Sequence, residues 1–143
     1  MPDIRHDLLV RAPLASVWRA LVTPAGLDAW WTLRSAGEPV LGADYELDFG
    51  PGYVWRGSVQ RCEPERALEW EIRDAHEDWE GTRVGFELEE SEGRTQVRFH
   101  HAGWKEAGAH YRGSCYCWAM YLRVMKRHVE HGEWVDYGER LEV

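Results

Sequence analysis

The sequence predicts an α+β fold in which a curved antiparallel sheet of about six or seven strands wraps around a long C-terminal helix. Two observations support this. Apolar residues alternate with polar ones across residues 33–104, and the longest helical pattern of the chain follows at residues 111–131. A sheet with one apolar face and a helix with one apolar stripe bury both surfaces by packing together. A chain of 143 residues suffices for one core, so we expect a single domain over residues 1–143. The sequence leaves the packing of residues 133–143 open.

Two short helices are expected between a first strand, at residues 4–11, and the meander. Pro13 fits the first turn of the first helix, where its missing N–H costs nothing. Thr23 and Pro24 are typical of the N-cap and first turn of a second helix. The apolar positions of these two helices are Leu14, Val17, Trp18 and Leu21, then Leu27, Trp30 and Trp31.

The alternation also predicts which strand residues face the interior. One wet and one buried face are expected, because the pattern is clean in each segment. The last strand should turn Thr95, Val97, Phe99 and His101 inward. The earlier inward sets are Tyr45, Leu47 and Phe49; Trp55, Gly57 and Val59; Leu68, Trp70 and Ile72; and Val84, Phe86 and Leu88.

The terminal helix carries apolar residues at intervals of 4, 3, 4, 3 and 4. Gly132 is typical of a helix C-terminus, so we expect the helix to stop there. The stripe consists of Tyr111, Cys115, Trp118, Leu122, Met125 and Val129.

Composition excludes several function classes. The formal net charge of −8 repels nucleic acid phosphates, so we expect no nucleic acid partner. No stretch approaches the ~20 apolar residues of a membrane helix, and the N-terminus does not resemble a signal peptide. The three cysteines lack C-x-x-C spacing and suit a reducing compartment, so we expect a cytoplasmic protein without membrane insertion.

Several motifs resemble one family. The opening reads Ala12-Pro13-x-x-x-Val17-Trp18-x-Ala20-Leu21 and Thr23-Pro24-x-x-Leu27-x-x-Trp30-Trp31. Later motifs are Gly57-x-Val59 with Pro64, Leu68 and Trp70; His101-x-Gly103-Trp104; and Trp118-x-x-x-Leu122 with Lys126. Over residues 4–132 the chain thus resembles the START-like (SRPBCC) superfamily, in the branch of the activator of heat-shock-protein-90 ATPase homologues. The resemblance implies a helix-grip fold with a cavity between sheet and helix, which in related proteins holds lipids, polyketides, hormones or aromatic metabolites.

Aromatic residues form the strongest functional signal, at 13% of the chain. The predicted fold directs them from several segments toward one interior, where they would line a cavity for a small hydrophobic or aromatic molecule. Tyr45, His101 and Tyr111 would supply its polar contacts. The leading hypothesis is a carrier or sensor with no catalysis of its own and no cofactor. The expected cavity residues are Trp31, Tyr45, Phe49, Trp55, Trp70, Phe86, Phe99, His101, Tyr111, Trp118 and Leu122.

Two alternatives stay open. An enzyme of cyclase, dehydratase or hydrolase type would act in the same cavity, with His101 as its acid–base and a tyrosine as partner. An interaction or chaperone-regulating module would instead use Tyr116, Met120 and Tyr121 as a partner or homodimer surface.

No metal site is expected. His100 and His101 point to opposite faces of a strand, and His128 and His131 lack a third ligand at fitting spacing. The acidic residues 74–80 are interpreted as a solvated loop, with Trp79 as a hypothetical flap over the cavity mouth.

Overall fold

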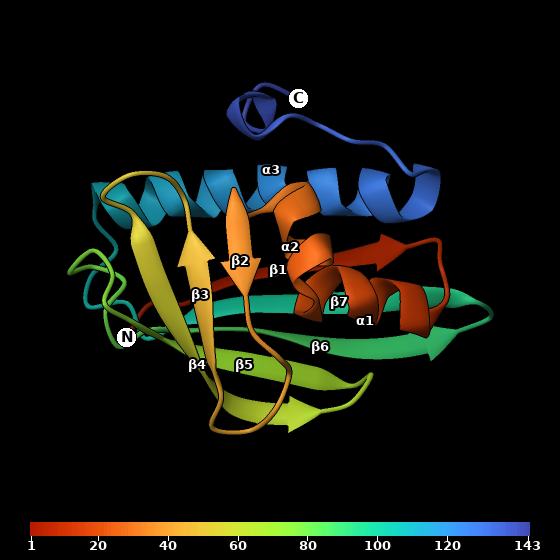
Figure 1. The fold of residues 1–143 in the computed structure, drawn as a ribbon, viewed down its shortest axis with the longest axis horizontal. Coiled ribbons are helices and arrows are strands. Elements are labelled where there is room, and N and C mark those ends of the chain that lie inside the picture. Colours follow the sequence, from red (N-terminus) through yellow and green to blue (C-terminus); the bar gives the residue numbers. More distant parts are fainter.

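A computed structural model describes residues 1–143 as one seven-stranded antiparallel sheet with three α-helices (Figure 1). The strands lie in the order β1-β7-β6-β5-β4-β3-β2, so β2 to β7 form a meander and β1 adds to its far edge beside β7. This confirms the predicted fold class. The elements are β1 (Ile4–Val10), α1 (Leu14–Val22), α2 (Pro24–Trp30), β2 (Arg34–Ala36), β3 (Asp44–Asp48), β4 (Val54–Glu63), β5 (Ala67–Arg73), β6 (Arg83–Ser91), β7 (Arg94–Ala102), α3 (Ala109–His131) and the 3-10 turn η1 (Tyr137–Glu139).

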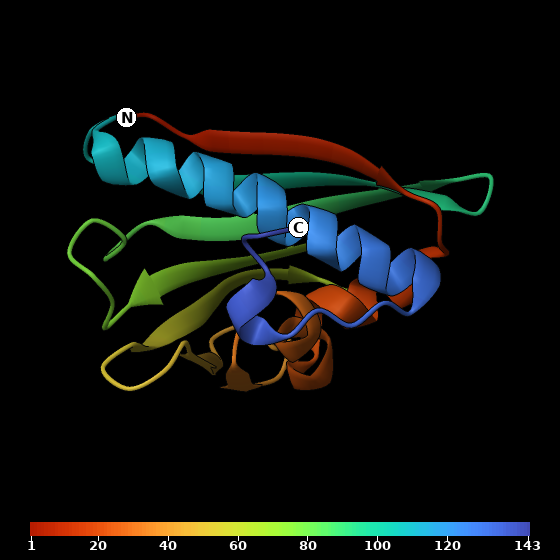
Figure 2. The same cartoon turned by 90° about the horizontal axis from the view of Figure 1, so that it is seen from above.

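Helix α3 runs diagonally across one face of the sheet, with α1 and α2 beside its C-terminal half (Figure 2). Residues with inward positions on the strands are buried beneath it, because each strand alternates between the core and solvent. Phe86 and Phe99 are directly paired across β6 and β7, and Leu68 pairs with Phe86 across β5 and β6. The strand register thereby stacks apolar side chains in rows under α3.

Local sequence signals set the helix boundaries. The Thr23 hydroxyl accepts a hydrogen bond from the Gly26 N–H at 3.0 Å, which caps α2 as predicted. Gly132 has φ 67° and ends α3, also as predicted. Pro13 is the N-cap residue of α1 and stands just before its first turn, one position earlier than expected. A Cβ on Gly26 would collide with the backbone of Ala20, so this glycine lets α2 approach α1 closely.

Residues 133–143 fold back over the molecule instead of extending from it (Figure 1). Arg140 is 1% exposed, and its guanidinium donates to the carbonyls of Thr32 at 3.1 Å, Val135 at 3.1 Å and Asp28 at 2.5 Å. These bonds satisfy the buried cation and attach the tail to the end of α2. None of the helices has the length and apolar character needed to cross a membrane.

Candidate functional site

The space between α3 and the sheet is filled by the protein's own aromatic rings. Trp31, Trp70 and Trp118 are each at most 2% exposed. The Trp31 ring centroid lies 5.1 Å from that of Trp118 and 6.0 Å from that of Trp70, and Phe99 lies 4.5 Å from Trp118. These are ordinary packing distances for aromatic pairs. Eight of the expected cavity residues are therefore buried: Trp31, Tyr45, Trp70, Phe86, Phe99, His101, Trp118 and Leu122.

Tyr45 and Tyr111, which we expected to contact a ligand, instead form hydrogen bonds with backbone carbonyls of the protein. The Tyr45 hydroxyl is buried and donates to the Val22 carbonyl at 2.7 Å, and burial raises the pKa of this phenol. The Tyr111 hydroxyl donates to the Asp3 carbonyl at 2.8 Å. Both groups hold elements together, Tyr45 joining β3 to α1 and Tyr111 joining α3 to the start of the chain.

His101 is fully buried at the centre of a hydrogen-bond chain. The Trp118 indole N–H donates to His101 Nδ1 at 3.0 Å, and His101 Nε2 lies 2.8 Å from the Thr82 hydroxyl. Since indole can only donate, Nδ1 accepts and Nε2 carries the proton. The Thr82 hydroxyl in turn donates to the Trp79 carbonyl. Burial lowers the pKa of His101 to about 3, so the ring is neutral near pH 7 and both of its nitrogens are engaged.

A groove of about 600 Å³ lies at the surface, over the first half of α3. Trp31, Phe49 and Trp55 are the expected cavity residues that the structure places on it. Leu122 borders a separate shallow hollow beside β1, and Tyr111 lines another next to Trp104. The groove is lined by Trp31, Phe49, Trp55, Trp79, Ala109, His110, Gly113, Ser114, Cys117, Tyr121 and Tyr137.

One wall of the groove is a continuous aromatic row. Trp31 and Phe49 meet edge to face with centroids 5.3 Å apart, and Phe49 meets Trp55 in the same way at 5.3 Å. Trp55 and Trp79 follow at 5.0 Å. Such a row offers broad flat contact area to an apolar or aromatic molecule.

The opposite wall is α3, which contributes the polar groups of the groove. The hydroxyls of Ser114 and Tyr121 form no hydrogen bond with the protein, whereas the Tyr137 hydroxyl donates to the Phe49 carbonyl at 3.0 Å and holds the tail in place. Burial raises the pKa of Tyr121 to about 12 and also raises the pKa of the Cys117 thiol. Both groups are therefore neutral at pH 7 and able to donate a hydrogen bond.

Trp79 separates the groove from His101. Its ring centroid lies 4.5 Å from that of His101, and it stacks on Trp118 at 5.8 Å. The side chain is 8% exposed, and its indole N–H, like those of Trp70 and Trp104, is buried without a partner. An unpaired buried donor is costly and uncommon. Ring packing holds the Trp79 side chain, while its backbone carbonyl accepts from Thr82.

Most residues of the α3 wall were not predicted as ligand-binding residues from the sequence. His110, Ser114, Cys117 and Tyr121 follow one another at intervals of 4, 3 and 4, which is a helical stripe. This second stripe lies beside the more apolar one that we assigned to the core. Its helical spacing was visible in the sequence, but its polar residues made it look like a solvent-exposed face. Tyr137 had no comparable signal.

Comparison with known proteins places the fold in a family. A family model described as "Activator of Hsp90 ATPase homolog 1-like protein" matches residues 11–130. The chain belongs to this family. The match confirms the resemblance stated from the sequence motifs and the helix-grip fold of the SRPBCC type. Among curated proteins, none is significantly similar to the chain.

Solved structures of the same fold cover nearly the whole chain. The Aha1 dimer from Colwellia psychrerythraea is 30% identical, with a TM-score of 0.83, over 93% of this chain and 99% of that one. MLL2253 from Mesorhizobium loti is 20% identical, with a TM-score of 0.82, over 92% and 99%. CalU16 from Micromonospora echinospora is 23% identical, with a TM-score of 0.76, over 98% and 84%. The last two establish similarity of fold alone.

Proposed function

We propose that this protein binds a small, mainly apolar molecule with an aromatic ring in the groove over α3, as a carrier or sensor without catalysis of its own. The groove itself supports this most strongly. Its volume of about 600 Å³ fits a molecule of drug-like size, and 8 of its 11 lining residues are hydrophobic. The proposal moves the ligand from the packed interior, where we expected it, to the surface of α3.

The groove also indicates the chemistry of the ligand. A flat ring system would lie against Trp31, Phe49 and Trp55, and a carbonyl or hydroxyl oxygen would accept from Tyr121 or Ser114. No lysine or arginine lines the groove, so a strongly anionic ligand would be left without a counter-charge. A neutral aromatic ketone, phenol or quinone has the right properties.

A substitution that fills the groove tests the proposal. Gly113 lies on the exposed surface of α3, and a Cβ there meets nothing within 4 Å. Gly113→Leu should fold normally, because replacing a helical glycine favours the helix, while its side chain occupies the groove. We expect binding of naphthol and anthraquinone probes, followed by calorimetry, to weaken at least tenfold, on the order of 1.4 kcal/mol.

Ala119→Leu is the matched control, since Ala119 is also exposed on α3 but lines the hollow beside β1. It should bind the probes as the wild type does. Equal binding by the Gly113→Leu variant, or no binding of any neutral aromatic probe by the wild type, would contradict a ligand in this groove.

The enzyme alternative receives no support from His101. A general base needs a free nitrogen within reach of a substrate proton, and the nitrogens of His101 are occupied by Trp118 and Thr82. Trp79 also covers the ring on the groove side. The carrier hypothesis needs none of these groups to move.

We further propose that the chain forms a homodimer in the cytoplasm. The 30% identical Aha1 structure is described as a dimer, and all three cysteines here are free thiols. Tyr116, which is 62% exposed, offers apolar area outside the groove. Light scattering of the purified chain should give twice its monomer mass of 16.7 kDa. A mass of one chain at all concentrations would refute the dimer.

A further inference from the structure

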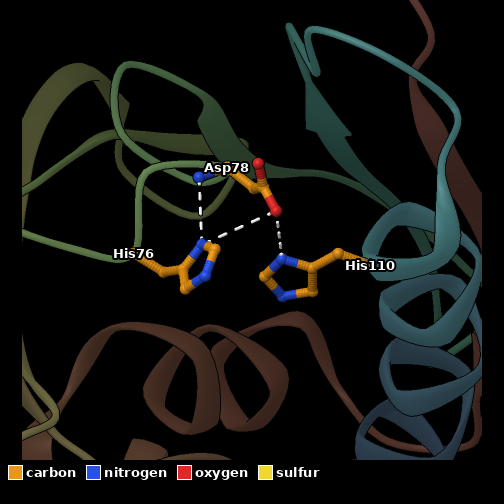
Figure 3. Close-up of side chains that lie close together, drawn as sticks. All are labelled: His76, Asp78 and His110. Carbon is orange, nitrogen blue, oxygen red and sulfur yellow. Dashed lines mark hydrogen bonds and ion pairs between the residues drawn. The ribbon is translucent and has the colours of Figure 1, made fainter.

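Three potential metal ligands converge from two segments at one end of α3 (Figure 3). His76 and Asp78 lie in the loop between β5 and β6, and His110 lies in the first turn of α3. His110 Nδ1 is 2.8 Å from Asp78 Oδ2, and His76 Nδ1 is 3.6 Å from the same oxygen. All three ligand atoms lie within 4.8 Å of one another.

We propose that His76, Asp78 and His110 bind one divalent transition-metal ion, with zinc as the representative ion. Two imidazoles and one carboxylate are a common ligand set for such ions, and three protein ligands leave a fourth position for water or another small ligand. The site shares His110 with the lining of the proposed ligand groove, but it does not depend on what the groove binds.

Binding requires the side chains to rotate by about an ångström. In a tetrahedral site, ligand atoms about 2.1 Å from the ion lie about 3.4 Å apart. The wider separations in the cluster, of up to 4.8 Å, must therefore shorten, and the 2.8 Å contact between Asp78 and His110 must open. The three side chains are 40–49% exposed, which leaves them room to rotate. His76 Nδ1 accepts a hydrogen bond from the Asp78 backbone N–H at 3.1 Å, so its lone pair is directed toward Asp78 and would exchange this bond for the ion.

The local charge also favours a cation. The Asp78 carboxylate supplies negative charge within the cluster itself. Asp74, Glu77 and Glu80 add carboxylates to the same loop. Lys105 of the neighbouring segment donates to the Glu77 carbonyl at 3.2 Å and lines the same hollow as Asp78 and His110.

A bound ion would tie the loop to α3. At present the loop reaches the helix through one side-chain hydrogen bond, that between Asp78 and His110. Trp79 follows Asp78 directly and stacks on His110 with a centroid distance of 6.5 Å. The ion would thus fix the loop that carries Trp79, the residue that separates the groove from His101.

Zinc titration of the untagged full-length chain, stripped with a chelator, tests the site. We expect one zinc per chain by calorimetry and at least tenfold weaker binding in His76→Ala and in His110→Ala. Cobalt in place of zinc should give the visible absorption of a four-coordinate site, and both variants should lose it. All substitutions are at exposed or half-exposed positions, and circular dichroism checks the fold.

Two control variants address competing donors. His131→Ala removes an exposed histidine near Glu130, and Cys115→Ser removes a thiol 3.9 Å from His6 Nε2. Both should bind zinc as the wild type does. The proposal is overturned if zinc does not bind at one equivalent, if His76→Ala and His110→Ala bind it unchanged, or if only Cys115→Ser weakens it.

Discussion

At the scale of single residues, the interior is organised by hydrogen bonds that leave no polar atom of His101 free. Its environment determines its charge, because Trp118 and Thr82 satisfy the neutral ring and burial disfavours the imidazolium ion. A histidine that would titrate near pH 6.5 in the unfolded chain therefore titrates near pH 3 in the folded one. This difference has a consequence for stability.

Acid should destabilise the protein through His101. Between pH 6.5 and about 3 the unfolded chain binds a proton at this residue that the folded chain does not. The contribution of His101 to the free energy of unfolding is therefore fully present above pH 6.5. Below pH 6.5 the free energy of unfolding falls by up to about 1.4 kcal/mol per pH unit. Urea unfolding at pH 7 and pH 5 measures this loss of unfolding free energy. In His101→Gln, which cannot titrate at this position, the loss between the two pH values should be smaller by the contribution of one proton.

The exposed His131 provides the comparison for this experiment. His131→Gln should retain the pH dependence of the wild type, because its ring is 70% exposed and lies outside the buried hydrogen-bond chain of His101. If the His101→Gln slope equals that of the wild type, His101 is not the group responsible.

At the scale of elements, the strands and helices followed from the sequence, because their boundaries and faces depend on local rules. Inward positions on β7 such as Val97, Phe99 and His101 are all buried, as the period-two pattern predicts. Thr23 and Gly132 marked helix ends through capping preferences that act within a few residues. The topology then required only that α3 cover the apolar face.

The candidate groove and metal cluster could be predicted from the sequence to a much smaller extent, since each combines residues from segments that are distant in the chain. Periodicity identified Trp31 and Phe49 as apolar but could not show that Trp31 packs into the interior while Phe49 lies half-buried at its margin. His110 lies 32 residues from Asp78, and no spacing rule connects a loop to a helix start at that separation. Tertiary packing alone brings these residues together.

The tail shows the same limitation. Nothing in residues 133–143 has a helical or strand period, yet Arg140 anchors them through the carbonyls of Asp28 and Thr32. Those carbonyls are backbone groups, so no side chain in or after α2 indicated the contact in the sequence. Through this anchor Tyr137 reaches the groove and closes one side of it.

At the scale of the whole molecule, the chain has a helix-grip fold whose interior is occupied by its own tryptophans. Filling the interior increases the buried apolar area and avoids the cost of a cavity. The proposed ligand groove accordingly lies at the rim, where Trp79 stands between it and the hydrogen-bonded His101. The depth of the groove therefore depends on whether the Trp79 ring fills the space next to His101.

Removing Trp79 should convert the groove into a deeper pocket. Trp79→Ala deletes a nearly buried indole and is expected to cost about 3–5 kcal/mol, because the surrounding rings cannot close the space fully. The apolar space left behind would accept a ring of the same shape, as cavities from such truncations can. We therefore expect indole to raise the melting temperature of Trp79→Ala while leaving that of the wild type nearly unchanged.

Trp134→Ala separates this effect from general binding of indole to the protein. Trp134 is 59% exposed, so its removal should cost little and create no pocket for indole. A Trp79→Ala variant as stable as the wild type would mean that Trp79 does not plug the interior. Equal stabilisation of both variants by indole would mean that the ligand binds elsewhere. Stabilisation of Trp79→Ala alone would establish that the fold retains a latent interior pocket, which its own side chain occupies in competition with a ligand.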